Sequence, residues 1–411
     1  MLHDHPDRPR VLAELHARPF SSIATPARFL HFAFLVDSIE AEHDCAQVER
    51  MVADESKESG WLAQKRYLSL EGGRFRWERH GEFVSYTLAA QPDAVPMWPT
   101  DLVPPGVLLV AVDLRTTSYD QPHTTIVNAP ILGGNAQVSS DFAPNAEGFV
   151  EITIVNRHMS EDLAGATVQR VLELETYRCL ALLGLPVAEK AAQTMGRIEK
   201  SLPAVMERMA TASTLGDNRD LLDRLTSMTV ELERSSASTH FRFGATRAYA
   251  ELVRLRLEAL SGGVNTASCE LLSFFSRRFE PAIRTCLTAA TREANLSRKL
   301  TRAAQLLRTR VEIALESQNR DLLEQMGERL QLQVRLQQTV EGLSIAAISY
   351  YVAGLFHLLV SGFGSASGAV DSELLTAVAI LPIVATVAIV MSRLRRHHQR
   401  CDQMTAPARG R

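Results

Sequence analysis

The sequence predicts an α+β membrane protein with an N-terminal mixed α/β domain, a helical bundle with a long stalk helix, and two C-terminal transmembrane helices. Three observations predict this fold. Short β-rich runs separated by Gly and Pro occupy residues 1–158. Good helix formers with few breakers occupy most of the following residues. Two apolar runs near the C-terminus have about the length that a membrane-spanning helix needs.

The N-terminal domain, residues 1–158, is predicted to contain a largely antiparallel sheet. Gly-Gly pairs at 72–73 and 133–134 and a Pro-Pro pair at 104–105 supply turns between the β-rich runs. A helix is expected over residues 38–55. The predicted strands cover residues 29–36, 66–70, 74–80, 82–88, 106–114, 123–128 and 148–155.

The region 159–280 is predicted to be helical. Ser160, followed by two acidic residues, is a suitable N-cap for a helix that ends near Gly184 and Pro186. Gly262-Gly263 is expected to separate the last two of the remaining helices. Those further helices are expected over residues 188–210, 218–234, 244–260 and 266–279.

A long stalk helix is predicted over residues 281–341. Pro281 suits the first turn of a helix, and only Gly327 interrupts the good helix formers that follow. Apolar residues recur every three or four positions, as in coiled coils and bundles. Continued into the first apolar run, this helix would be about 120 Å long at 1.5 Å per residue. Such a length implies packing against other helices, from the same chain or from sister subunits.

The two apolar runs are predicted to be transmembrane helices over residues 342–362 and 374–392. His357 is the only ionisable residue of the first run, and residues 374–391 of the second contain none. Pro382 is tolerable in a membrane helix, where neighbouring groups satisfy the freed carbonyl. The alternative is a buried helical hairpin of a soluble protein, which usually shows a polar stripe on each helix. The second run lacks such a stripe.

The flanking charges predict the orientation of these helices. The basic tail, residues 393–411, follows the second run and is expected to anchor the chain to lipid headgroups. The outer loop, residues 363–373, has no Lys or Arg and carries Asp371 and Glu373. Because positive flanks stay inside, both termini are expected to be cytoplasmic, in a bacterial inner (plasma) membrane. No secretory signal precedes the domain. The anchoring candidates in the tail are Arg393, Arg395, Arg396 and Arg400.

The sequence gives little sign of catalytic chemistry. Phosphate-binding loops, nucleophile elbows, zinc-protease motifs and dinucleotide fingerprints are all missing. No catalytic residue, enzyme activity or cofactor is therefore predicted, and a net charge of −3 argues against a nucleic-acid partner. The five cysteines are scattered and are expected to be reduced thiols.

Two polar clusters in the N-terminal domain have a functional and a structural interpretation. His3, His5, His16 and Arg18 could bind a metal or an anion, but they lack the ligand spacing of a metal site, so solvated side chains are favoured. The run 77–82 contains Trp77, Glu78, Arg79, His80 and Glu82. Strand alternation splits these side chains between two faces, which favours a structural hairpin with a paired Glu and Arg over a single site.

The first apolar run has a polar face. Tyr350, Gly354, His357 and Ser361 are spaced four, three and four residues apart, and so lie on one side of a helix. Polar residues in a membrane span usually face a bundle interior or an aqueous path, which makes these four pore-lining candidates. Gly354 and Ser361 are also small, as in close helix packing, so a dry packing seam is the alternative.

Several long blocks of the sequence are specific enough to indicate a family. They are HPDRPRVLAELHARPF (5–20), RWERHGEFVSYT (76–87), VLELETYRCLALLGLP (171–186), FEPAIRTC (279–286), LLRTRVEIALESQN (306–319) and LQQTVEGLSIAAISYYVAGL (336–355). These blocks resemble an uncharacterised bacterial family of membrane-anchored proteins, DUF3422. The resemblance spans nearly the whole chain and supports the membrane interpretation, but it implies no activity.

The predicted arrangement of the chain also resembles CorA-type cation channels, which are pentamers whose first span lines the pore and ends in Gly-Met-Asn. In this sequence Gly362, Phe363 and Gly364 lie at the end of the first predicted span, and Gly-Met-Asn is missing. The resemblance therefore does not extend to the motif that selects magnesium. The resemblance implies a homo-oligomer and a divalent or other cation as partner. It makes Gly362, Gly364, Asp371 and Glu373 candidates for the outer mouth of a pore.

Two functions follow as hypotheses. The first is a homo-oligomeric inner-membrane protein that transports a cation. The second is a membrane-anchored scaffold or ligand-binding protein without transport activity. The polar face of the first span favours transport, whereas the missing selectivity motif and the aliphatic second span favour anchoring.

Overall fold

The computed structural model divides into two compact units, Met1–Arg308 and Thr309–Arg411. The residues that the structure describes are 5, 8, 21–55, 65–70, 73–91, 94, 98–119, 125–262, 270–364 and 372–405.

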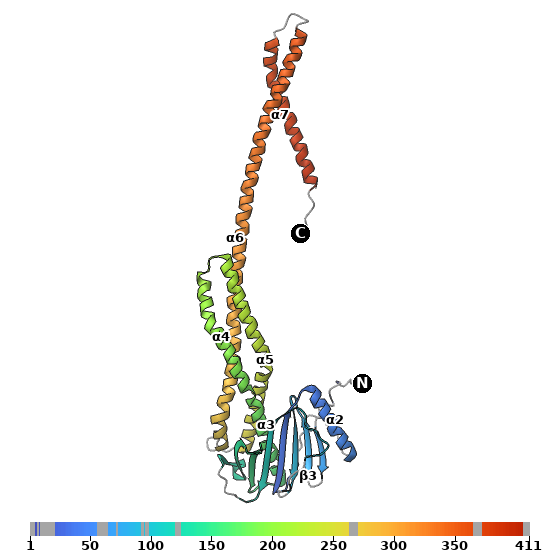
Figure 1. Ribbon diagram of the computed structural model, residues 1–411, viewed down its shortest axis with the longest axis vertical. Helices are drawn as coiled ribbons and strands as arrows, with labels where there is room; N and C mark the ends of the chain where they lie inside the picture. The colour runs from blue at the N-terminus through green and yellow to red at the C-terminus, as the bar shows by residue number, and fades with distance from the viewer. Residues whose placement is uncertain are drawn as a thin grey trace. The chain divides into compact units, whose positions relative to one another are not determined.

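The first unit contains an eight-stranded mixed sheet with the strand order β2-β3-β4-β1-β5-β8-β7-β6 (Figure 1). Six of the seven strand pairs are antiparallel, and β5 and β8 pair in parallel. The predicted largely antiparallel sheet is therefore confirmed. The strands are β1 (Ala27–Leu35), β2 (Lys65–Leu70), β3 (Gly73–Arg79), β4 (Phe83–Ala90), β5 (Val107–Thr117), β6 (Val127–Ile131), β7 (Ala136–Pro144) and β8 (Val150–Asn156).

Alternation along the strands gives the sheet two apolar faces. Phe75 and Trp77 of β3 pack with Val48 of helix α2 (Ser38–Glu55), which covers one face. Val112 and Leu114 of β5 belong to the core on the other face, where helices pack against the sheet. A side-chain period of two residues is what separates the two cores.

Four helices follow the sheet: α3 (Glu161–Leu182), α4 (Gly184–Thr211), α5 (Leu215–Ser261) and α6 (Glu270–Gly364). A short 3₁₀ turn, η1 (Leu132–Gly134), separates β6 from β7. Ser160 caps α3 as predicted, because its side chain accepts a hydrogen bond from the backbone N–H of Leu163. Gly262, with a φ of 66°, ends α5 in the left-handed conformation that Gly adopts without strain.

The helices of the first unit build two cores. Apolar residues of α3, of the C-terminal part of α5 and of the start of α6 share the core of the sheet. Beyond it, α4 and α5 lie alongside α6 (Figure 1) and enclose a second core that contains Met195, Leu225 and Leu300. The first unit thus combines a sheet domain with a helical bundle.

Three local predictions differ from the structure. The two helices expected over 218–234 and 244–260 are one helix, α5, because buried residues along the stretch, Leu232, Thr239 and Phe243, pack against neighbouring helices. Pro281 lies inside α6 and not in its first turn. Strand β7 was not predicted, although it pairs with both β6 and β8.

The second unit consists of the remainder of α6 and of α7 (Ser372–Thr405). The apolar part of α6 is long and apolar enough to cross a membrane, by length and composition, and only 6 % of its apolar window is buried. The apolar part described in α7, Ala377–Arg393, is shorter. One candidate span is therefore present among the described residues, and the expected pair of transmembrane helices is not shown.

Candidate functional site

Strand β3 carries the charged run that the sequence singled out. Arg76 and Glu78 point to the same side of the sheet, and their Nη2 and Oε2 atoms lie 3.5 Å apart. Trp77 points to the opposite side, where its Nε1 donates a hydrogen bond of 2.7 Å to Asp44 of α2. The predicted division between two faces is confirmed for Trp77 and Glu78, whereas His80 and Glu82 lie beyond the end of β3.

A chain of polar contacts ties this strand to α3 and α5. Arg76 donates to the Gln169 side chain over 3.3 Å, and Gln169 donates to Glu173 over 2.9 Å. Arg256 of α5 forms an ion pair with Glu173. Together these contacts join the sheet to both helices across a largely buried interface, where charge-assisted hydrogen bonds are strong.

His31 lies within the same cluster. Its Nδ1 is 2.9 Å from the Thr87 hydroxyl, and its Nε2 is 3.0 Å from the Thr176 hydroxyl. Burial, reinforced by the positive charge of Arg76, lowers the pKa of His31 to about 3. The imidazole is therefore neutral near pH 7.

The space inside this cluster is small. The cavity bounded by His31, Arg76, Glu78 and Thr176 measures about 20 Å³, enough for one water molecule and too little for a substrate. We therefore assign the cluster a structural role. His31 is not among the candidates predicted from the sequence, although a lone His within the apolar run FLHFAFLV is a signal of a buried polar group.

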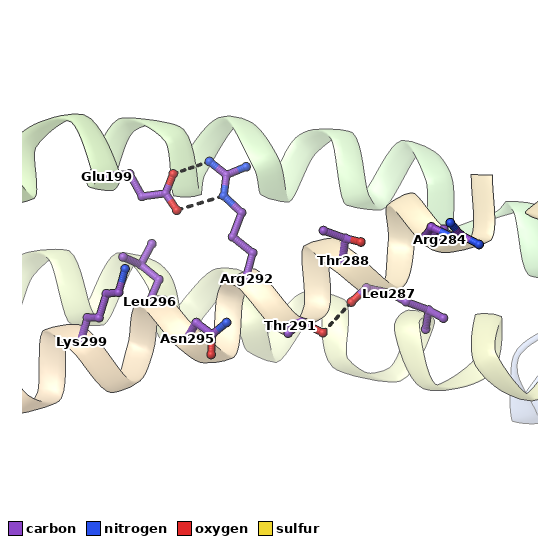
Figure 2. Close-up of a pocket in the computed structure, with 9 residues that line it drawn as sticks. All are labelled: Glu199, Arg284, Leu287, Thr288, Thr291, Arg292, Asn295, Leu296 and Lys299. Carbon is purple, nitrogen blue, oxygen red and sulfur yellow. Dashed lines mark hydrogen bonds and ion pairs between the residues drawn. The ribbon is translucent and has the colours of Figure 1, made fainter. Parts of the chain in front are cut away.

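A larger hollow lies between α4 and α6 (Figure 2), with a volume of about 460 Å³. Arg292 of α6 reaches across to Glu199 of α4, and its Nε donates a hydrogen bond of 2.9 Å. This contact lowers the pKa of Glu199 and raises the pKa of Arg292, because each charged group stabilises the other. Arg284 and Lys299 line the same hollow from α6. Since its charged groups are exposed, the hollow is an open basic surface and not an enclosed site.

No metal centre is seen among the described residues, where no group of three or more His, Cys, Asp or Glu side chains could hold a metal ion. Of the N-terminal cluster, His5 is described, and its carbonyl accepts a hydrogen bond from the backbone N–H of Arg8. His3, His16 and Arg18 lie outside the described residues.

The four pore-lining candidates all lie on α6 in the second unit. Tyr350 is 77 % exposed, and no atom comes within 4 Å of a Cβ built on Gly354. His357 and Ser361 are half-buried, and the Ser361 hydroxyl donates to the carbonyl of Leu358. The structure thus leaves Tyr350 largely exposed, with a ring contact to Tyr351, and leaves open space beside Gly354.

The remaining candidates flank the apolar segments. Gly362 is exposed and Gly364 ends α6, while Glu373 lies in the first turn of α7 and Asp371 lies outside the described residues. Arg393 is exposed. The structure places Arg395, Arg396 and Arg400 in α7 and describes only their backbone.

A family model described as "Protein of unknown function (DUF3422)" matches residues 3–398 of the chain. The match covers nearly all of the sequence, so the chain belongs to this family. No curated protein and no solved structure was found to match. The resemblance to CorA-type channels is therefore not supported, and neither is the pentamer that it implied.

Proposed function

We propose that this member of the DUF3422 family is an integral membrane protein of the bacterial inner membrane, anchored by a hairpin of two spans, residues 342–362 and 374–392. The observation that carries the proposal is the exposure of the apolar end of α6, where Leu355, Leu358 and Leu359 are each at least 60 % exposed. Exposing large apolar side chains to water costs about 25 cal/mol per Å², a penalty that a bilayer removes.

The charges around the hairpin support an orientation with both termini in the cytoplasm. Arg393, Arg395, Arg396 and Arg400 follow the second span, whereas residues 363–373 contain no Lys or Arg. Basic residues near a span stay on the cytoplasmic side and attract anionic lipid headgroups. The lipid bilayer is accordingly the first partner in this proposal.

The orientation can be tested by cysteine labelling in intact spheroplasts. A Ser367→Cys variant places a thiol in the outer loop, so a membrane-impermeant maleimide should label it from outside. The five native cysteines, including Cys401 in the basic tail, are expected inside and should remain unlabelled until the membrane is permeabilised. The wild-type protein is therefore the matched control. Labelling of wild type in intact cells, or none of the variant, would contradict the proposed topology.

Cation transport by a homo-oligomer is a second candidate function. The observation that favours it is the polar Tyr350, which is exposed on an apolar helix next to Gly354, where there is open space. In a membrane such groups usually face a bundle interior or an aqueous path, so this surface would face sister subunits. The apolar residues Leu322, Met326 and Leu330, each more than half exposed on α6, also favour helix association.

Flux measurements on purified protein in liposomes test this second candidate. Liposomes that contain the wild-type protein should take up a divalent or monovalent cation faster than empty liposomes do. The His357→Ala and Ser361→Ala variants should change that rate of uptake. Gly354→Leu should weaken the oligomer by preventing close helix approach. Oligomers without measurable flux would leave the anchored scaffold, without transport, as the function.

A further inference from the structure

A groove of about 450 Å³ runs between α5 and α6 within the first unit. Two hydrogen bonds fix its walls: the Ser297 hydroxyl donates to Glu233 over 2.6 Å, and the Thr239 hydroxyl donates to Glu293 over 3.0 Å. Both bonds join α5 to α6, so the groove has a defined width.

Glu293 is the unusual residue of this groove. It is only 5 % exposed, and Oε2 accepts the hydrogen bond from Thr239. Its other oxygen, Oε1, is buried and has no hydrogen-bond partner in the described part of the chain. A buried acceptor without a donor costs about 1–3 kcal/mol, and more when it is charged. The position therefore favours a ligand that donates hydrogen bonds.

Gly244 keeps the groove open beside this carboxylate. It lines the groove from α5, and no atom lies within 4 Å of a Cβ built on it. Packing between the helices thus does not require glycine here. Since glycine also weakens a helix interior, its presence is better explained by the space that it leaves.

A positive charge lies further along the groove. Arg247 lines it, is exposed and forms no hydrogen bond or ion pair with the other described residues. It follows Thr239, the partner of Glu293, by eight residues, which is about 12 Å along a helix. Arg298, the other arginine of the groove, instead donates to the carbonyl of Ala294 in its own helix.

These positions define the chemistry of a ligand. We propose that the α5–α6 groove binds a small linear zwitterion, with an ammonium group that donates to Glu293 and a carboxylate that pairs with Arg247. The flexible Arg247 side chain can shorten the distance between the two charges. The spacing between Glu293 and Arg247 favours a ligand whose ammonium and carboxylate groups are several bonds apart, and disfavours a compact α-amino acid.

Calorimetric titration of the full-length protein in detergent with three matched compounds tests the proposal. The compounds are 5-aminopentanoate, pentylammonium and pentanoate, which share a chain and differ in their charged ends. We expect saturable binding of 5-aminopentanoate that is about tenfold tighter than binding of either single-charge analogue. Arg247→Gln should remove the preference for 5-aminopentanoate over pentylammonium and leave the binding of pentylammonium unchanged.

Two further variants separate loss of the site from loss of the fold. Glu293→Gln should weaken binding about tenfold, because the amide loses the charge. Gly244→Leu should block the groove while the thermal midpoint stays equal or rises, since the leucine enters open space and favours the helix. Glu207→Gln, an exposed position of α4 outside the groove, is the matched control.

The expected pattern is binding lost in Gly244→Leu and retained in Glu207→Gln. Absence of saturable binding for all three compounds would overturn the proposal, and water would then satisfy Glu293. Binding that neither Glu293→Gln nor Gly244→Leu alters would overturn it as well, because the ligand would occupy another place.

Discussion

His31 shows how one buried side chain can make the stability of the first unit depend on pH. It is 4 % exposed and contacts two Thr hydroxyls, so the folded protein holds it neutral. Its pKa is lowered from 6.5 to about 3 in the folded state, first by burial and then by Arg76. Between these two pH values the unfolded chain binds a proton that the folded chain does not. Stability is therefore lost as the pH falls below about 6.5.

We predict that the lowered pKa of His31 reduces the unfolding free energy of the wild-type unit by about 2 kcal/mol when the pH falls from 7 to 5. The difference in unfolding free energy between the wild type and His31→Gln, measured at each pH, isolates the contribution of His31, because the other titrating groups are common to both proteins. Urea unfolding followed by the fluorescence of Trp77 and Trp98 gives the free energies. A wild-type and a variant curve that stay parallel over this range would contradict a lowered pKa.

Asp44 is the corresponding residue on the other face of the sheet. It is fully buried and accepts hydrogen bonds from the Trp77 Nε1 and the Tyr86 hydroxyl, at 2.7 and 2.6 Å. Burial raises its pKa, and these two donors act in the opposite direction. The carboxylate thus holds α2 to β3 and β4.

Asp44→Ala should reduce the unfolding free energy by about 2–6 kcal/mol, because each of two buried donors left without a partner costs about 1–3 kcal/mol. The same urea experiment measures it. Asp223→Ala, at an exposed position of α5, is the control and should change stability by about 0.5 kcal/mol or less. Equal effects of the two variants would remove the structural role assigned to Asp44.

At the scale of elements, the start of α4 is fixed by a close approach. A Cβ on Gly184 would lie 2.2 Å from the Thr246 hydroxyl of α5 and 3.3 Å from the Cys286 sulfur of α6. The Thr246 hydroxyl is itself held by the carbonyl of Ala181, so it cannot move freely. Glycine is required at this point by packing between the three helices.

Gly184→Ala should therefore destabilise the first unit by about 1–3 kcal/mol through overpacking. Gly196→Ala on the same helix is the control, because no atom lies within 4 Å of its Cβ, and should stabilise the unit by about 0.5–1 kcal/mol. Thermal unfolding of the two variants measures both effects. Shifts of the same sign would show that helix propensity, and not the contact with Thr246, dominates at Gly184.

Local sequence predicted most of these elements. Helix α2, the cap of α3 at Ser160 and six of the eight strands follow from periodicity, cap residues and turn residues, while the strand expected over 123–128 overlaps β6 only at its end. Strand β7 was missed because its run AQVSSDFAP is largely polar, and its pairing with β6 and β8 holds it in place. The position of Pro281 within α6 likewise depends on packing, because Phe279 and Ile283 around it are buried in the core of the sheet.

At the scale of the molecule, the two units differ in where their apolar residues lie. The three apolar cores are formed by residues up to Leu307 and so belong to the first unit. Long apolar stretches of the second unit are exposed. The first unit carries its own cores, whereas most of the large apolar side chains described in the second are exposed.

A chain ended after Arg308 should consequently be soluble without detergent and should unfold cooperatively. The full-length protein should require detergent or lipid to stay dispersed. Size-exclusion chromatography with and without detergent compares the two. Aggregation of the shorter chain, or a full-length protein dispersed in buffer alone, would contradict this division and weaken the proposed membrane anchor.

The sequence by itself determined the division into an N-terminal sheet domain and a long helical part, the apolar character of the C-terminal segment and the family of the chain. These properties depend on residues close together in the chain, whose periodicity and composition can be read directly. Only the tertiary structure decided that Asp44 and Glu293 are buried, and that a side chain would clash at Gly184 but not at Gly244. These features depend on which segments, far apart in the sequence, pack against each other, and local sequence patterns do not predict such contacts.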